Sequence, residues 1–303
     1  MRLVSFRSTP AFGAEPGRSD RLGIVDGDRV VPASSLGPGI AGTMSELLAS
    51  WPSSLAPLRE AWDAARHGAA ADSVGVALAD IELLAPVPRP GKIAAAGVNY
   101  RSHGQEQNRE PPDHPVLFAK FASSVVGHGA EIRWSPELTQ AVDYEAELAV
   151  VIGATCRRVE PAQALAFVAG YTCLNDVSAR DLQYADRQFV RAKSLDTFGP
   201  MGPWLVTADE IADPQGLRIR CLVNDEVMQD SSTADMIFSV AELVSFCSQA
   251  FTLEPGDVIA TGTPAGVGWF RDPKRMLHDG DEVTVEIEHI GRLVNRCREE
   301  RSG

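Results

Sequence analysis

The chain has 303 residues, of which 44% are hydrophobic and 23% charged, and its formal net charge is -13 at pH 7. Nucleic-acid binding requires a basic surface that neutralises phosphates, and this acidic composition argues against it. No apolar run approaches the roughly 20 residues that span a bilayer, and the five cysteines form no CxxC pair, so we expect a cytoplasmic protein without membrane segments, disulfide bonds or a cysteine zinc site.

Residues 1–85 are predicted to form a small N-terminal domain. The segment 83–92 holds three prolines, which disfavour a helix and cannot serve a central strand, so a linker is expected there. The elements expected before the linker are a strand over 2–6, a hairpin turn at Asp26 and Gly27, and helices near 43–50 and 56–69.

Residues 92–297 are predicted to form a second domain that is mainly β, which makes the protein α+β. Numerous strands without regular alternation of strand and helix indicate a mixed and largely antiparallel architecture. Pro161 and Ser178 are typical of helix starts. The expected strands cover 116–120, 147–153, 217–224, 257–262 and 281–297, and the expected helices cover 161–171, 178–188 and 239–249.

Acidic residues of this second domain form the first candidate site. Strand alternation puts Asp143, Glu145 and Glu147 on one face. Such a face is usually solvated, but the strand continues as an apolar run, and like charges that enter a core need a proton or a cation. Asp176 supplies another carboxylate further along the chain. Hard oxygen donors suit Mg²⁺, Mn²⁺ or Ca²⁺ better than zinc or copper.

Several motifs, taken in order over about residues 92–297, resemble those of the fumarylacetoacetate hydrolase family. The resemblance implies a catalytic domain built on a rolled mixed β-sheet, an Mg²⁺ or Mn²⁺ ion bound by Glu145, Glu147 and Asp176, and a homodimer. The motifs are GVNYRSHGQEQ (97–107), PVLFAKFASSVVG (115–127), VDYEAELAVVIG (142–153), AGYTCLNDVSARDLQ (169–183), AKSLDTFGPMGPW (192–204) and ATGTPAGVG (260–268).

Further polar residues are candidates for contacts with a substrate. Lys193 is expected to place its ammonium beside substrate oxygens, and this role rests on the surrounding motif because an isolated lysine is usually solvent-exposed. Arg180 and Gln183 lie one helical turn apart and could face the same site, although Arg180 could equally form a structural salt bridge. Thr263 could offer its hydroxyl and backbone N–H to a carboxylate, or it could simply form a turn.

His103 and Glu106 have the i, i+3 spacing of one helical turn. An arbitrary pair of this kind is usually a surface pair, but the resemblance places this one where hydrolytic and decarboxylating family members keep a His–Glu dyad on a mobile lid. In that role the carboxylate orients the imidazole, which takes a proton from water. Phe121 stands where the family commonly has Pro, which leaves the role of Lys120 open.

The resemblance implies an enzyme that acts on a small 2-oxo acid. The leading hypothesis is hydrolysis of a carbon–carbon bond in an acylpyruvate-type substrate. The same metal site would serve oxaloacetate-type decarboxylation or 2-hydroxyhepta-2,4-diene-1,7-dioate isomerisation, because all three reactions expel or form an enolate. A non-catalytic module that binds metal or 2-oxo acids is a further alternative, which the combined presence of the carboxylates, Lys193 and the dyad disfavours. The substrate's tail depends on packing and stays open.

Overall fold

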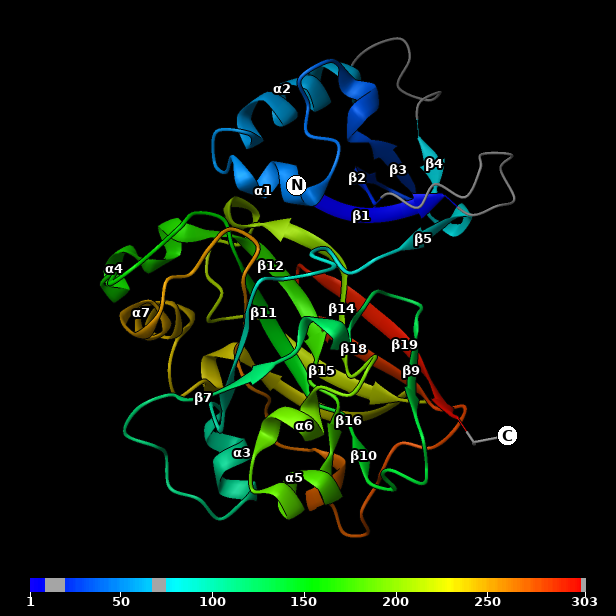
Figure 1. Cartoon of the computed structure of the whole chain (residues 1–303), viewed down its shortest axis with the longest axis vertical. Helices are drawn as coiled ribbons and strands as arrows, with labels where there is room; N and C mark the ends of the chain where they lie inside the picture. The colour runs from blue at the N-terminus through cyan, green and yellow to red at the C-terminus, as the bar shows by residue number, and fades with distance from the viewer. Residues whose placement is uncertain (9–19, 67–74, 301–303) are drawn as a thin grey trace.

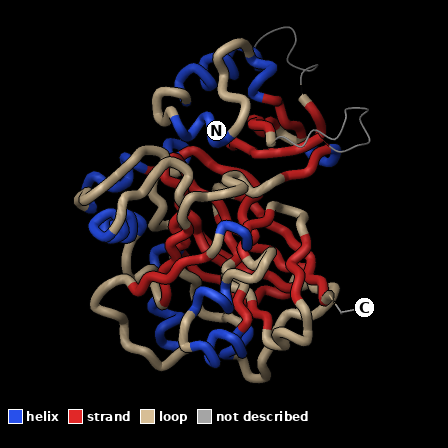
Figure 2. Tube along the Cα trace, viewed as in Figure 1, coloured by secondary structure: helices blue, strands red, loops and turns tan. Residues whose placement is uncertain are grey.

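The computed structural model describes residues 1–8, 20–66 and 75–300. Strands form the body of the molecule within these residues, and helices lie around its periphery (Figure 1, Figure 2). The architecture confirms the α+β class and the mixed sheets that the sequence predicts.

The larger sheet contains the strands that carry the candidate site. Its hydrogen-bonded pairs are antiparallel, apart from the parallel pairs of β17 (Val258–Ala260) with β6 (Ile93–Gly97) and of β14 (Gly199–Thr207) with β8 (Val125–Val126). Along the described chain its order is β4 (Val76–Ala77), β3 (Arg29–Pro32), β2 (Arg21–Asp26), β1 (Arg2–Ser8), β14, β12 (Val168–Asn175), β11 (Ala146–Ile152), β17, β6 and β7 (Val116–Lys120), with β5 (Ile81–Leu83) beside β1 and β8 beside β14.

A smaller sheet packs against the larger one. Leu148 and Val150 of β11 share one buried apolar cluster with Ile219 and Val285 from the smaller sheet, so the main core lies between the two layers. A separate short pair joins β10 (Val142–Asp143) to β13 (Ser178–Ala179). The smaller sheet follows the order β16 (Glu226–Ser232), β15 (Arg218–Val223), β18 (Glu282–Ile287), β19 (Gly291–Glu299) and β9 (Glu131–Trp134).

The helices are short, and two of them start with capping boxes. Ser239 accepts a hydrogen bond from the Glu242 N–H while the Glu242 carboxylate accepts from the Ser239 N–H, which explains why α7 begins where the sequence predicts. The α-helices are α1 (Met44–Ala49), α2 (Leu55–Arg66), α3 (Arg101–Glu106), α4 (Pro161–Ala164), α5 (Arg180–Asp186), α6 (Phe189–Lys193) and α7 (Val240–Ala250). Short 3₁₀ turns cover Ala33–Leu36, Leu78–Asp80, Ala122–Ser124, Leu165–Phe167, Ala208–Glu210, Thr233–Asp235 and Gly268–Phe270.

The N-terminal residues extend the larger sheet. Arg2 of β1 pairs with Val206 of β14, and Leu3 belongs to the same buried apolar cluster as Val151 of β11. Figure 1 shows α1 and α2 covering this part of the sheet, away from α3, α5 and α6. The strand over 2–6, the hairpin and both helices were predicted, although residues 67–69 of the second predicted helix lie outside the described residues. The boundary between domains at 85 and 92 stays a prediction.

Two predictions of local structure are wrong. The helix expected over 161–171 ends with a 3₁₀ turn at Phe167, and β12 follows directly. Every residue of β12 is buried, so its sequence shows no alternation that would distinguish a strand from a buried helix. Ser178 does not cap a helix, because it lies in β13 and α5 begins at Arg180 without a side-chain cap.

The strand expected through the acidic motif is also interrupted. β10 ends at Asp143 and β11 begins at Ala146, so Tyr144 and Glu145 form a break. Because of this break, Asp143 does not share a face with Glu145 and Glu147 as the sequence predicts, and its contacts within the site differ from theirs.

Candidate active site

Antiparallel pairing of β11 with β12 brings the predicted carboxylates together. Ala146 pairs with Asn175 in this ladder. The next residues outward are Glu145 and Asp176, and the Asp176 N–H donates to the Glu145 carbonyl over 2.9 Å. Together with Glu147 they each offer one oxygen within 4.8 Å of the others, and all three residues are buried. The pairing of β11 with β12 therefore brings together carboxylates that lie far apart in the sequence.

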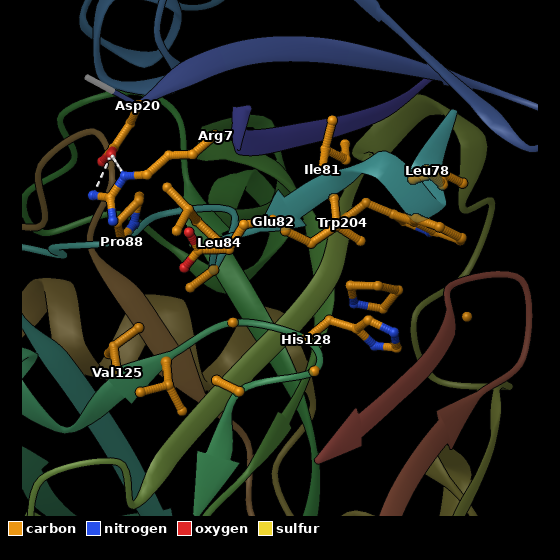
Figure 3. A pocket seen from close by; sticks show the side chains of 18 of the residues that line it. Arg7, Asp20, Leu78, Ile81, Glu82, Leu84, Pro88, Val125, His128 and Trp204 are labelled. Atoms are coloured by element: carbon orange, nitrogen blue, oxygen red, sulfur yellow. Dashed lines mark hydrogen bonds and ion pairs between the residues drawn. The ribbon is translucent and has the colours of Figure 1, made fainter. Parts of the chain in front are cut away.

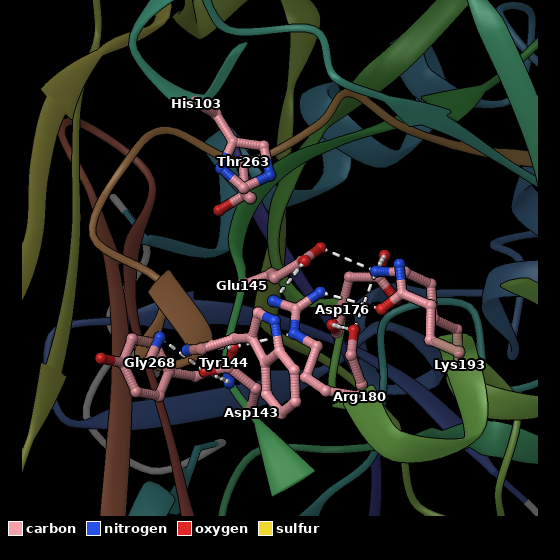
Figure 4. Close-up of polar contacts among 12 residues, drawn as sticks. His103, Asp143, Tyr144, Glu145, Asp176, Arg180, Lys193, Thr263 and Gly268 are labelled. Atoms are coloured by element: carbon pink, nitrogen blue, oxygen red, sulfur yellow. Dashed lines mark hydrogen bonds and ion pairs between the residues drawn. The ribbon is translucent and has the colours of Figure 1, made fainter. Parts of the chain in front are cut away.

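Lys193, at the end of α6, lies among these carboxylates (Figure 4). Its Nζ donates to Glu145 Oε2 over 2.7 Å and to Asp176 Oδ2 over 2.6 Å. A third bond of 2.8 Å goes to the Ser178 hydroxyl, which is the function of this serine in place of helix capping. All three donors of the ammonium are therefore engaged.

Lys120 is a second buried lysine at the cluster. Its Nζ donates to Asp176 Oδ1 over 2.7 Å and to the backbone carbonyls of Lys193 and Phe198. The Phe121 N–H donates to the Ser194 hydroxyl over 3.0 Å, a bond that proline could not form. The departure from the family pattern therefore adds a hydrogen bond, and Lys120 still reaches the site.

Arg180, at the start of α5, is a buried cation with several partners. Its Nη2 lies 2.7 Å from Glu145 Oε1, and its Nη1 donates to Gln183 Oε1 over 3.0 Å. Its Nε donates to Asp143 Oδ2 over 2.8 Å. Of the two roles that the sequence left open, the salt bridge is therefore present.

Asp143 anchors the site's framework and does not join the carboxylate cluster. Alternation predicted that it would share a face with Glu145 and Glu147, but the break after β10 turns it toward Arg180. It also accepts hydrogen bonds from the N–H groups of Gly268 and Trp269 over 2.7 and 3.0 Å. Asp143 therefore connects Arg180 to the 3₁₀ turn Gly268–Phe270, which begins at the last residue of the ATGTPAGVG motif.

The clustered carboxylates differ in their electrostatics. Burial opposes the ionisation of Glu145, but the positive charges of Lys193 and Arg180 outweigh it and hold the pKa of Glu145 well below its usual range. Burial, followed by the negative charges of Asp176 and Glu145, raises the pKa of Glu147 well above its usual range. The neighbouring positive charges therefore outweigh the cost of burial at Glu145 but not at Glu147.

The donor set fits a hard divalent cation. It consists of carboxylate oxygens from Glu145, Glu147 and Asp176, which Mg²⁺ and Mn²⁺ accept and which Ca²⁺ could also take. A cation would also relieve the repulsion that raises the pKa of Glu147. Gly262 donates its N–H to Glu147 Oε2 over 2.9 Å, at a φ of +93° that favours glycine, so one lone pair of this carboxylate is already oriented.

The predicted dyad is assembled on α3. His103 Nδ1 lies 3.0 Å from Glu106 Oε2, and Glu106 Oε1 accepts a hydrogen bond of 2.9 Å from the Gly266 N–H. The imidazole is buried and meets the Phe270 ring edge-on, with 6.2 Å between ring centroids. Because Glu106 holds Nδ1, the free Nε2 is the nitrogen that can exchange a proton.

Most of the predicted site residues line one hollow of about 370 Å³, which we call the site hollow. This volume suits a small molecule. Asp176 and Glu106 are not among its lining residues, but each contacts one that is, because Asp176 accepts from Lys193 and Glu106 contacts His103. Thr263 reaches the wall, but its hydroxyl already donates to the Ala146 carbonyl over 2.9 Å, so any contact of that hydroxyl with a substrate stays a prediction. The predicted residues on its wall are His103, Glu145, Glu147, Arg180, Gln183, Lys193 and Thr263.

Some features of the site were not identified from the sequence. Asp143 was assigned to the acidic face and Ser178 to a helix start, but their contacts with Arg180 and Lys193 were not predicted. Arg109, Arg187 and Tyr184 also line the site hollow. They lie on or beside α3 and α5, and no spacing rule distinguishes them from surface residues.

Comparisons with known proteins agree on one family. Residues 92–298 match the family described as fumarylacetoacetate (FAA) hydrolase C-terminal. The mitochondrial oxaloacetate tautomerase FAHD2A of Homo sapiens is 42% identical over 298 residues, which cover 98% of this chain and 91% of that protein. No helix in the described ranges has the length and apolar character needed to cross a bilayer. The cytoplasmic location stays a prediction.

Solved structures of two other enzymes have the same fold. The maleylpyruvate hydrolase of Sphingobium sp. SYK-6, in complex with manganese (II) ion and pyruvate, is 32% identical with a TM-score of 0.77, and 99% of each chain is covered. The 2-hydroxyhepta-2,4-diene-1,7-dioate isomerase of Mycobacterium marinum is 34% identical with a TM-score of 0.73, covering 100% of this chain and 99% of that one.

Proposed function

Because this chain belongs to the fumarylacetoacetate hydrolase family, we propose that it is a divalent-metal-dependent enzyme that interconverts the enol and keto forms of a small 2-oxo dicarboxylic acid of the oxaloacetate type. The observation behind proton transfer at this site is the His103–Glu106 dyad, assembled beside the same hollow as the carboxylate cluster. The activity named for the human relative supports this choice of substrate.

The protein's own groups would divide the work between binding and proton transfer. Glu145, Glu147 and Asp176 would hold Mg²⁺ or Mn²⁺, which when bound stabilises negative charge on the keto oxygen of a 2-oxo acid. His103 Nε2 would deliver a proton to the carbon beside the keto group, or remove one from it, while Glu106 keeps Nδ1 engaged and so fixes the tautomer.

Lys193 and Arg180 would act mainly by holding Glu145 in place. Both cations are buried and contact this carboxylate at 2.7 Å. Their positive charge keeps Glu145 ionised, which is the state that a cation requires of its ligand. A substrate oxygen that accepted a hydrogen bond from Lys193 would have to displace one of the three protein oxygens that its ammonium now contacts.

Hydrolysis of an acylpyruvate-type carbon–carbon bond is the second candidate. The dyad favours it, because a base with a free Nε2 could take a proton from water instead of carbon. The related hydrolase structure, which holds manganese and pyruvate, supports the same chemistry. In both reactions His103 would be the base. It would exchange a proton with a carbon atom of the substrate in enol–keto interconversion, and it would take a proton from water in hydrolysis.

A panel of substrates distinguishes these candidates. Enol-oxaloacetate, an acylpyruvate and a 2-hydroxy-dienoate would each be given to the wild-type protein with Mn²⁺, following loss of enol absorbance and identifying the products. We expect ketonised oxaloacetate with no cleavage. Formation of pyruvate and a carboxylic acid from the acylpyruvate would favour hydrolysis, and release of carbon dioxide would favour decarboxylation. The absence of turnover with every substrate would contradict the proposal that the protein is an enzyme.

We also propose a homodimer, as the family resemblance implies, with most contacts made by residues 92–297. Light scattering at micromolar concentration should give twice the mass of one chain. A monomer would contradict this proposal while leaving the chemistry of the carboxylate cluster unaffected.

A further inference from the structure

The cations that line the site hollow fall into two classes. Lys193 and Arg180 are bonded to buried carboxylates, as described above. Arg109 and Arg187 line the same hollow, yet no acidic side chain in the described part of the chain forms an ion pair with either of them. Their charges are therefore available to an anion.

Arg109 is held close to the dyad by the backbone. α3 ends after Glu106, Asn108 takes a left-handed conformation with a φ of +52°, and the Arg109 N–H donates to the Gly104 carbonyl over 2.9 Å. The chain thus folds back on the helix that carries His103. Arg109 and the proposed base are consequently parts of one local unit.

Arg187 has a corresponding place at the end of α5. It is the residue that ends the helix, with φ +55° and ψ +19°, a left-handed conformation that costs free energy for residues other than glycine. Arg180 and Gln183 lie on the same helix and line the same hollow. Arg187 therefore ends the helix whose other residues reach the hollow, and its own side chain lines that hollow as well.

The other residues that line the site hollow indicate which kind of ligand would contact these arginines. Phe118, Tyr184, Phe189 and Phe270 contribute aromatic surface to the hollow, so its wall combines apolar surface with charged groups. The protein's net charge of -13 repels anions in general. Two uncommitted guanidinium groups at one hollow are therefore a local exception, and guanidinium binds carboxylates with directed hydrogen bonds.

We propose that Arg109 and Arg187 bind the second carboxylate of a 2-oxo dicarboxylate whose 2-oxo acid end lies at the carboxylate cluster. This inference rests on the proposed function and narrows it, because it makes the protein selective for dicarboxylates over monocarboxylates. Oxaloacetate and pyruvate share the 2-oxo acid group and differ in the second carboxylate, so they make a matched pair of probes.

The test is to measure dissociation constants for oxaloacetate and pyruvate with the Mn²⁺-loaded protein. We expect wild type to bind oxaloacetate at least about tenfold more tightly than pyruvate. Arg109→Gln and Arg187→Gln should each weaken oxaloacetate binding about tenfold to a hundredfold, the range for a hydrogen bond to a charged group. Pyruvate binding should change by less than about twofold, since pyruvate has no second carboxylate.

Arg191→Gln is the matched control. Arg191 is an exposed arginine on α6 that pairs with Asp186 at 2.6 Å and does not line the site hollow, so the same loss of charge should leave both dissociation constants unchanged. Equal weakening of both ligands, or unchanged oxaloacetate binding, in the Arg109 and Arg187 variants would overturn the inference. If wild type distinguishes the ligands but turns over neither oxaloacetate nor an acylpyruvate, the proposed function fails while the arginine assignment stands. Binding of neither ligand overturns both.

Discussion

Two of the hollows in the described part of the molecule differ in volume and in how far their charged side chains are buried. The large hollow, lined by β5, the segment 125–130 and Trp204, has a volume of about 1090 Å³, against about 370 Å³ for the site hollow (Figure 3). Its ion pair of Arg7 with Asp20 has both side chains about one third exposed, whereas the side chains of Lys193 and Glu145 at the site hollow are 4% and 6% exposed.

The buried charges lie at the hollow of smaller volume. Burying a charge is costly unless it is paired, so a fold that gathers several charges in one small hollow does so at the expense of stability. Strongly shifted pKa values at Glu145 and Glu147 occur at the smaller hollow, where functional groups are expected. Substitutions of the same kind in each hollow therefore test the contrast.

Glu147→Gln should give the largest effect, with opposite signs for stability and function. The pKa of Glu147 is raised by burial and by Asp176 and Glu145, so in the metal-free protein stability is lost as the pH rises above the ordinary carboxyl range. Glutamine is neutral and can still accept the Gly262 N–H, so it removes this cost. We expect an unchanged or higher Tm of the metal-free protein at pH 7, with Mn²⁺ affinity lowered more than about a hundredfold and turnover lost.

Calorimetric titration with Mn²⁺ and thermal unfolding check both signs. A variant that is folded and binds Mn²⁺ like wild type would remove Glu147 from the metal site. A large fall in the Tm of the metal-free variant would instead show that the ionised carboxylate stabilises the fold.

His103→Gln should follow, with turnover lowered about a hundredfold to ten-thousandfold, the usual share of a general base. Metal affinity should not change, because His103 is not among the clustered ligands. Steady-state kinetics beside Mn²⁺ titration separate the two properties. Turnover near the wild-type rate would exclude the dyad as the proton-transfer group and leave another group to move the proton.

Glu106→Gln should cost less, about tenfold to a hundredfold in kcat, as for other carboxylates that orient a histidine. Glutamine has one acceptor oxygen, so it can accept from either His103 Nδ1 or the Gly266 N–H, whereas the two oxygens of Glu106 contact these groups at 3.0 and 2.9 Å. If it accepts from Nδ1, the Gly266 hydrogen bond is lost, and so is the charge that stabilises a protonated imidazole. A loss as large as that of His103→Gln would show that Glu106 takes part in proton transfer itself.

The smallest effect is expected from the same substitutions in the large hollow. Glu82→Gln and His128→Gln change residues that line it and are matched to Glu147→Gln and His103→Gln. His128 Nδ1 accepts the Val294 N–H over 3.2 Å, which glutamine can also do. We expect kcat/KM within about twofold of wild type, as for substitutions remote from a site. A tenfold loss in either variant would connect the large hollow to the chemistry.

The sequence predicts the ligands of the carboxylate cluster better than the geometry that assembles them. Glu145 and Glu147 follow from strand alternation before a buried run, Asp176 was noted as a further carboxylate along the chain, and the family resemblance grouped the three. These carboxylates come together only because β12 pairs with β11. All residues of β12 are buried, so its sequence lacks the alternation of a half-buried strand, and part of it was predicted to be helical. The turn of Asp143 toward Arg180 depends on a strand break that alternation alone does not indicate.

The free arginines show a second limit of prediction from sequence. The sequence does not distinguish Arg109 and Arg187 from Arg180. The structure does, because Arg180 forms salt bridges with buried carboxylates and the other two arginines form none with the described residues. Those partners come from segments far apart in the chain. Their identification requires the packed fold.

If the buried carboxylate cluster is the active site and works with one divalent cation, turnover should depend on Mn²⁺ bound at that cluster. The most direct test is to titrate Mn²⁺ into the chelator-treated protein while measuring both bound Mn²⁺ and the rate of enol-oxaloacetate ketonisation, corrected for the rate with Mn²⁺ alone. The rate should rise in proportion to bound Mn²⁺ and saturate at one ion per chain, and Glu147→Gln should show neither response. A full rate in the metal-free protein, or an unaltered titration in Glu147→Gln, would contradict the claim.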